Sequence, residues 1–223
     1  MTTAIETYLN SLSDNIPTID ISVEGIKSLP DLTRFKNLKK LICSHNQLTS
    51  LPTLPQNLQI LICDNNLLTY LPTLPQNLQI LYCYNNKLTS LPTLPQNLKE
   101  LNCYNNKLTS LPTLPQNLKE LNCYNNKLTS LPTLPQNLEI FNCVNNPIYE
   151  IVQSNTLIKI KQKIQILNNF HHLYYCLKFK KQLRKWLWEK VREPHAKKEY
   201  HPKYLIENLK DEDDLDTVLD NWK

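Results

Sequence analysis

Apolar and polar residues follow a pattern along residues 31–150 that returns every 20 residues. The stretch 91–110, LPTLPQNLKELNCYNNKLTS, recurs unchanged at 111–130, and near-copies begin at Leu51, Leu71 and Leu131. All copies share the skeleton L-x-x-L-x-C-x-x-N-x-L, with small replacements in the last one. Each unit is too short to bury its own apolar side, so the pattern predicts a solenoid in which stacked turns share one core.

Each unit predicts a short strand and an extended return segment. The alternation around residues 61–63 is typical of a half-buried strand, and equivalent strands would form a parallel sheet. We expect Asn66 and its equivalents to turn inward, where the amide can bond backbone groups that the turn leaves unpaired. The segment LPTLPQN carries Pro52 and Pro55, which oppose a helix and favour an extended, polyproline-like run.

The skeleton resembles that of the leucine-rich repeat family. The short unit with two prolines is similar to repeats of secreted bacterial effectors, and LPTLPQNL…LNCYNNKLTSLP is similar to leucine-rich repeat proteins of mimivirus-type giant viruses. The resemblance covers about two thirds of the chain. It implies an α/β leucine-rich repeat solenoid with a short-stranded parallel sheet, a fold that hosts many unrelated activities.

Both ends of the chain depart from the repeat and predict helical caps. We expect an N-terminal helical cap in residues 1–18, a solenoid of one degenerate and six 20-residue repeats in residues 19–150, and an all-α C-terminal cap in residues 151–223. Caps are expected because a bare solenoid end exposes both the core and a sheet edge. Within the C-terminal cap, we predict that the first helix ends at Asn168-Asn169 and that a second, basic helix and then acidic helices follow.

Six of the seven cysteines occupy one repeat position, residues 43, 63, 83, 103, 123 and 143. A metal site needs ligands closer together than this spacing of 20, so we interpret the cysteines as buried thiols that replace leucine. Reduced thiols suit the cytosol. The first residues lack the features of a secretory signal, and no stretch is apolar enough to cross a membrane. We therefore expect a cytoplasmic protein.

Catalysis has little support in the composition. The chain has one glycine, Gly25, so loops that cradle phosphates with several glycines cannot be built. His172 and Cys176 could share a helix face, but two ligands do not make a zinc site. We expect a non-enzymatic protein with no cofactor and no bound metal.

The outward positions of the strands form columns, and we call this surface, the concave side of such a solenoid, the strand face. One column runs Ser44, Asp64, Tyr84, Tyr104, Tyr124, Val144, and its neighbour runs Ile42, Ile62, Tyr82, Asn102, Asn122, Asn142. Lysines flank it at Lys87, Lys107 and Lys127. Tyrosine gives large contact area at low entropy cost and asparagine gives adaptable hydrogen bonds, which suits protein recognition. The alternative is that β-propensity and duplication alone placed the tyrosines.

We predict that a monomeric chain binds a protein partner through the strand face. The residues expected to carry this binding are Tyr82, Tyr84, Asn102, Tyr104, Asn122, Tyr124 and Asn142.

An uneven charge distribution supports a second function. Residues 1–150 hold ten basic and ten acidic residues, whereas residues 151–223 hold fifteen and ten. Within residues 178–192, four basic residues lie opposite an apolar helical stripe: Lys178, Lys181, Lys185 and Arg192. Such a face can bind nucleic acid, an anionic membrane or a calmodulin-like partner, or it can simply be the solvated side of a cap helix.

Overall fold

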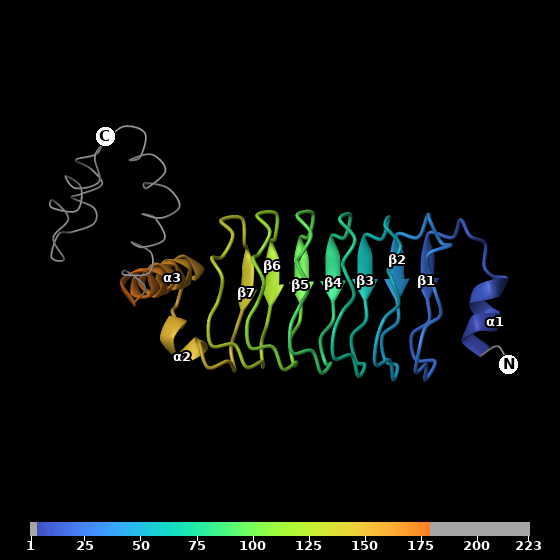
Figure 1. Ribbon diagram of the computed structural model, residues 1–223, viewed down its shortest axis with the longest axis horizontal. Helices are drawn as coiled ribbons and strands as arrows, with labels where there is room; N and C mark the ends of the chain where they lie inside the picture. Colours follow the sequence, from blue (N-terminus) through green and yellow to red (C-terminus); the bar gives the residue numbers. More distant parts are fainter. Residues whose placement is uncertain (1–3, 179–223) are drawn as a thin grey trace, which may run out of the picture. The chain divides into compact units, whose positions relative to one another are not determined.

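The computed structural model describes residues 4–178, with side chains up to residue 170, and shows a ladder of short parallel strands (Figure 1). The chain divides into residues 1–168, which contain every described strand, and residues 169–223. Helix α1 spans Ala4–Ser11, α2 spans Tyr149–Val152, and α3 spans Leu157–Lys178 across the division. The described strands are β1 Thr18–Asp20, β2 Lys40–Ile42, β3 Ile60–Ile62, β4 Ile80–Tyr82, β5 Glu100–Asn102, β6 Glu120–Asn122 and β7 Ile140–Asn142.

The strands form one parallel sheet in chain order, which confirms the predicted solenoid. Ile19 of β1 pairs in register with Leu41, so the degenerate first turn belongs to the same sheet. From β2 to β6 the central residue is always a buried leucine lying in register with its copies. The register therefore places each apolar side chain above its equivalent, and burial of each leucine contributes about 1.5–3 kcal/mol.

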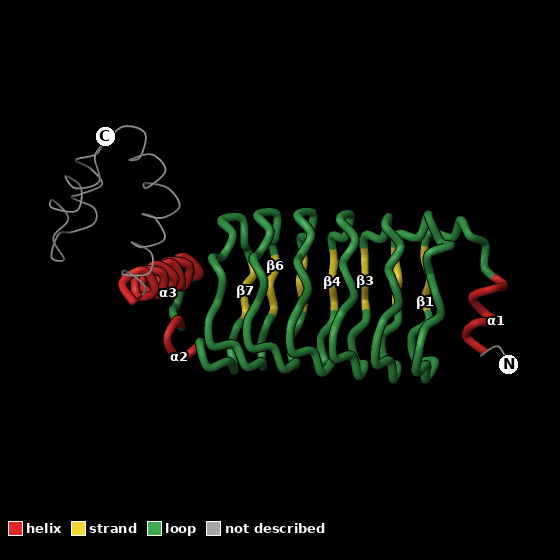
Figure 2. Tube along the Cα trace, viewed as in Figure 1, coloured by secondary structure: helices red, strands yellow, loops and turns green. Residues whose placement is uncertain are grey.

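The return segments are extended, as predicted. Between residues 12 and 148 the described chain contains strands and loops but no helix (Figure 2). In the segment that begins at Leu51, Leu51 and Leu54 are buried while Thr53 is exposed. The N–H of Leu58 donates to the carbonyl of Pro55 at 3.1 Å, which turns the chain back toward the next strand. Each return segment thus adds apolar side chains to the core without a convex helix.

A buried asparagine closes each turn, which confirms the inward position expected for Asn66. We call this column the inner asparagine ladder: Asn46, Asn66, Asn86, Asn106, Asn126 and Asn146, all at most 9 % exposed. The Asn106 amide nitrogen donates to the carbonyls of Cys83, Cys103 and Tyr104 at 3.0–3.2 Å. Its oxygen accepts the N–H of Leu88 at 3.0 Å. One side chain therefore satisfies backbone groups of its own turn and of the preceding one.

The residue before each buried asparagine has a left-handed backbone. These residues are His45, Asn65, Asn85, Asn105, Asn125 and Asn145, with φ between 50° and 56°. Glycine usually occupies such positions, but asparagine tolerates them better than other side chains. The N-N dipeptide of the repeat therefore combines one asparagine for the turn with one for the core.

Helix α1 covers the N-terminal end of the core through Leu9, which is 2 % exposed. Ile5 and Leu12 pack beside it. Arg34 of the next turn donates to the carbonyl of Leu9 and pairs with Asp14, so the helix is tied to the solenoid by polar contacts as well.

Helix α3 packs on the last turn through Ile164, which is 2 % exposed, with Ile160 and Leu167 beside it. Lys161 donates through Nζ to the carbonyls of Gln136 and Leu138 at 2.8 and 3.1 Å, which satisfies backbone groups of the last turn that no further described strand pairs with. The predicted break at Asn168-Asn169 is wrong, because α3 continues to Lys178. Asparagine lowers helix propensity by only a few tenths of a kcal/mol, and neighbouring packing outweighs this.

The six repeat cysteines are unpaired and buried, as predicted. Burial raises the pKa of the Cys43 and Cys83 thiols to about 12 and that of Cys143 to about 11. It also raises the pKa of Cys63, Cys103 and Cys123 well above the ordinary value. These thiols stay protonated in the folded chain and pack as small apolar groups.

Replacement of one inner-ladder residue should destabilise the solenoid strongly. Asn106→Ala leaves the N–H of Leu88 without its acceptor and removes one of the two donors from each of three carbonyls, so we expect a loss of about 3 kcal/mol in the free energy of unfolding. Urea unfolding followed by circular dichroism measures it. The control is Asn97→Ala, which removes an exposed bond to Gln76 and should cost at most about 1 kcal/mol. Equal losses for the two variants would contradict the role assigned to the ladder.

The buried thiols should make stability fall at alkaline pH. Unfolded thiols ionise near their ordinary value of 9.0, whereas the buried ones keep their proton to higher pH, so the unfolded state gains stability as pH rises. Between about pH 8 and about pH 10, each buried thiol should lower the unfolding free energy by about 1.4 kcal/mol.

The comparison of wild type with Cys103→Ala isolates one thiol from all other titrating groups. The decrease in unfolding free energy over this pH range should be smaller in the variant by about 1.4 kcal/mol. Identical decreases would show that the Cys103 thiol is already ionisable in the folded chain.

Candidate interaction face

The seven residues predicted to bind a partner lie along the strand face. Tyr82, Asn102, Asn122 and Asn142 end strands β4 to β7, and each is half-buried. The other three, Tyr84, Tyr104 and Tyr124, follow two residues after their strands and are also half-buried. The structure therefore brings the predicted residues to one surface as two adjacent columns.

Two of the tyrosines form a fixed aromatic pair. The rings of Tyr84 and Tyr104 stack with centroids 4.5 Å apart and planes at 9°. Burial, with the nearby negative charge of Asp64, raises the pKa of Tyr84 to about 12. Tyr124 is held differently, since its hydroxyl accepts a hydrogen bond from the Asn145 amide at 2.9 Å. The column is thus ordered before any partner arrives.

Tyr82 contacts the next turn through its hydroxyl, which donates to Glu100 at 2.6 Å. This hydrogen bond to a carboxylate, together with partial burial, raises the pKa of Tyr82 to about 12. The Tyr82 side chain is therefore a neutral donor at physiological pH and holds Glu100 at the start of β5.

The three asparagines of the second column differ in their hydrogen bonds. Asn122 and Asn142 each accept, through the side-chain oxygen, the N–H two residues further on, at 3.2 and 3.1 Å. The Asn102 oxygen is the one buried side-chain acceptor without a partner among the residues whose side chains are described. An unpaired buried acceptor of this kind costs about 1–3 kcal/mol.

The N-terminal end of the tyrosine column differs from its prediction. The alternation of the strand places Ser44 and Asp64 outward, but they are only 6 % and 2 % exposed. The Asp64 carboxylate accepts bonds from the Ser44 hydroxyl at 2.8 Å and the Asn65 amide at 2.7 Å, and His45 lies 4.0 Å away. Short polar side chains at this position bond one another and are covered by their neighbours, whereas the longer tyrosines remain half-exposed.

A second chain of amides, which we call the outer asparagine ladder, consists of Asn65, Asn85, Asn105 and Asn125. Each amide nitrogen from Asn85 onward donates to the side-chain oxygen of the preceding member, at 2.6–2.9 Å. The Asn65 amide then donates to Asp64, so the ladder runs in one direction and ends on a carboxylate. Aligned bonds of this kind strengthen one another, and the charged acceptor adds to them. Sequence reasoning missed this ladder, although the first asparagine of each N-N pair was its signal.

Three exposed lysines, which we call the lysine row, lie beyond the ends of strands β4, β5 and β6: Lys87, Lys107 and Lys127. Their backbone N–H groups bond the carbonyls of Leu68, Leu88 and Leu108 at 2.8–2.9 Å. None of the ion pairs found among the described residues involves this row. Leu67 occupies the same repeat position one turn earlier and is 38 % exposed.

The other predicted sites have less structural support. Lys181, Lys185 and Arg192 lie outside the described residues, as does the side chain of Lys178, so the basic face of residues 178–192 stays a prediction. In the part of the chain that the structure describes, no three His, Cys, Asp or Glu residues gather closely enough to hold a metal ion. Within the same part, no helix is both long enough and apolar enough to cross a membrane.

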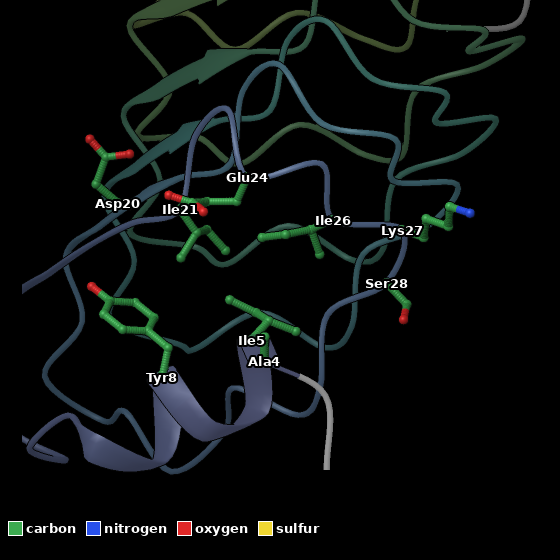
Figure 3. Close-up of a pocket in the computed structure, with 9 residues that line it drawn as sticks. All are labelled: Ala4, Ile5, Tyr8, Asp20, Ile21, Glu24, Ile26, Lys27 and Ser28. Carbon is green, nitrogen blue, oxygen red and sulfur yellow. The ribbon is translucent and has the colours of Figure 1, made fainter. Parts of the chain in front are cut away.

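A cavity of about 540 Å³, which the sequence did not indicate, lies between α1 and the first turn. Figure 3 shows Ile5 and Tyr8 reaching from α1 toward Asp20, Ile21 and Ile26. The walls of this cavity are mainly apolar, and the Asp20 carboxylate lies on its rim. Hydrogen bonds from the hydroxyl and N–H of Ser22 lower the pKa of Asp20 and keep it ionised. The cavity depends on where α1 packs, and no sequence repeat marks it.

The repeats match a known family by sequence. The family described as Leucine Rich repeats (2 copies) matches residues 76–116 and 96–136, and Leucine Rich Repeat matches residues 37–58. Among curated proteins, none matches the chain.

Solved structures of bacterial effectors resemble the solenoid. YopM from Yersinia enterocolitica WA-314 is 40 % identical over 61 % of this chain and 30 % of its own, with a TM-score of 0.59. YopM from Yersinia pestis is 42 % identical over 58 % of this chain and 37 % of its own, with a TM-score of 0.53.

A Shigella effector leucine-rich repeat domain is 37 % identical over 64 % of this chain and 63 % of its own, with a TM-score of 0.56. The chain thus spans less than two thirds of the length of each of these relatives. Repeat sequence, parallel sheet and structural neighbours agree, and the chain is a leucine-rich repeat protein that resembles the repeat domains of bacterial effectors.

Proposed function

We propose that this chain is a non-enzymatic scaffold that binds another protein through the strand face. The observation that carries the proposal is the double column of half-buried tyrosines and asparagines that runs across successive turns on β4 to β7. Large aromatic side chains with a polar tip dominate many protein interfaces, and asparagine adapts its hydrogen bonds to a partner.

The fixed positions of these side chains favour tight binding. Tyr84 stacks on Tyr104, while Tyr82 and Tyr124 are held through their hydroxyl groups. A side chain that is already ordered loses little conformational entropy when a partner binds. The strand face therefore requires little reorganisation, and its half-exposed rings supply the contact area.

The buried, protonated thiols support a cytosolic setting for this scaffold. Six unpaired cysteines persist in reducing compartments, whereas extracellular proteins more often pair theirs. We propose that the chain acts as a monomer there, with a protein as its partner.

Removal of the tyrosine rings should abolish specific capture of the partner. In the triple variant Tyr84→Ala, Tyr104→Ala, Tyr124→Ala, the contact area at the centre of the strand face is lost, and we expect binding to weaken at least about tenfold. Quantitative mass spectrometry of proteins captured from lysate by wild type and variant measures the change.

The matched control removes two exposed tyrosines elsewhere, Tyr8→Ala and Tyr70→Ala, which are 45 % and 55 % exposed. This control should retain the partners that wild type captures. Circular dichroism must first show that both variants stay folded. Retention of every specific partner by the folded triple variant would refute binding through the tyrosine column.

A further inference from the structure

We infer that the strand face receives an acidic polypeptide segment that runs along the solenoid and places its carboxylates on the lysine row. This inference rests on the proposed function and names the chemistry of its partner.

The lysine row concentrates positive charge by its geometry. The strands of consecutive turns lie about 4.8 Å apart, so the stems of Lys87, Lys107 and Lys127 start at this spacing. A backbone hydrogen bond at each lysine holds its turn in register with the preceding turn. The lysines therefore cannot move apart by a shift of one turn against the next. Like charges this close repel one another, and an anionic ligand would remove that repulsion.

The described part of the chain supplies no acidic partner to these lysines. Its only lysine–carboxylate ion pair joins Lys119 to Glu139 at 3.3 Å. The acidic column of the strand face, Glu100 and Glu120, starts β5 and β6, whereas the lysine row lies beyond the strand ends. Glu100 is moreover engaged by the Tyr82 hydroxyl. The two signs of charge thus occupy opposite sides of the tyrosine and asparagine columns, so an acidic segment has one favourable position.

An apolar residue, Leu67, occupies the lysine position of the turn that precedes the lysine row. Leu67 replaces lysine at the same repeat position and is 38 % exposed. The corresponding residue of each of the next three turns is lysine. A segment with one apolar side chain followed by several carboxylates would match this order of Leu67, Lys87, Lys107 and Lys127.

A polypeptide fits this surface better than a nucleic acid does. Tyr84 and Tyr104 stack on each other, which occupies ring faces that bases would use. Glu100 and Glu120 on the same face would repel a second row of phosphates. Backbone amides and mixed side chains of a polypeptide can instead meet the asparagine column.

The test uses a fluorescein-labelled oligoglutamate peptide with one leucine at its end, and it measures binding by fluorescence anisotropy over a series of salt concentrations. The variant Lys87→Gln, Lys107→Gln, Lys127→Gln should bind the peptide about tenfold more weakly than wild type, because the exposed charge pairs are lost together. Its binding should also depend less on salt.

The matched control carries Lys39→Gln, Lys99→Gln and Lys119→Gln, which remove the same total charge just before strands β2, β5 and β6. These lysines are exposed, and their contacts are the Lys99 bond to Gln79 and the Lys119 pair with Glu139. The control should bind the peptide within about twofold of wild type. A third variant, Leu67→Lys, extends the row and should tighten binding of oligoglutamate that lacks the leucine.

Three results would overturn the inference: no measurable binding by wild type, equal weakening in both lysine variants, or tighter binding of oligothymidylate of equal charge that depends on the row. The same variants can be used in the lysate capture. If the lysine-row variant captures its partners normally while the tyrosine variant does not, this inference fails and the proposed function stands. If neither variant loses a partner, the proposed function fails as well.

Discussion

The buried asparagine of each turn is the interaction on which the rest of the structure depends. A strand of three residues pairs few backbone groups, and the turn after it would leave carbonyls without donors at a depth that water does not reach. Asn106 meets this requirement for its own turn and for the preceding one, through Cys103 and Cys83 respectively. A leucine could fill the space but could not bond those carbonyls. The N–H of Leu88 in turn bonds the Asn106 oxygen of the following turn. A single turn therefore cannot satisfy its own backbone, and the fold exists only as a stack.

The same stacking converts a repeated sequence into an ordered surface. Because the strands pair in strict register, every position of the 20-residue unit becomes a column on the solenoid. Small departures from the repeat then have large local effects. Aspartate at position 64 in place of tyrosine buries a carboxylate and ends the outer asparagine ladder, while leucine at position 67 in place of lysine ends the lysine row. The residues that differ between copies therefore determine how the chemistry of the strand face changes from turn to turn.

The sequence predicted those features that follow from periodicity and local sterics. Asn66 could be placed inside because a polar residue at a fixed step among leucines must meet buried backbone, and Pro52 with Pro55 excluded a convex helix. The break at Asn168-Asn169 was mispredicted because helix propensity is weaker than the packing of Leu167 on the core. Asp64 was predicted to be exposed but is buried. The alternation of residues along a strand predicts the direction of a side chain but not which neighbours cover it. The direction of the outer ladder and the cavity beside α1 could not be predicted, because both depend on contacts between segments.

Two adjacent turns, residues 91–110 and 111–130, have the same sequence and pair in register, so the stack has no preferred number of such copies. A gain or loss of one copy changes the gene by one whole unit and leaves every remaining junction intact. The surface can therefore lengthen only in integer steps, each of which brings one more tyrosine, one more asparagine pair and one more lysine. The length of the strand face can therefore change in evolution through the number of copies, without any change in the residues of each copy.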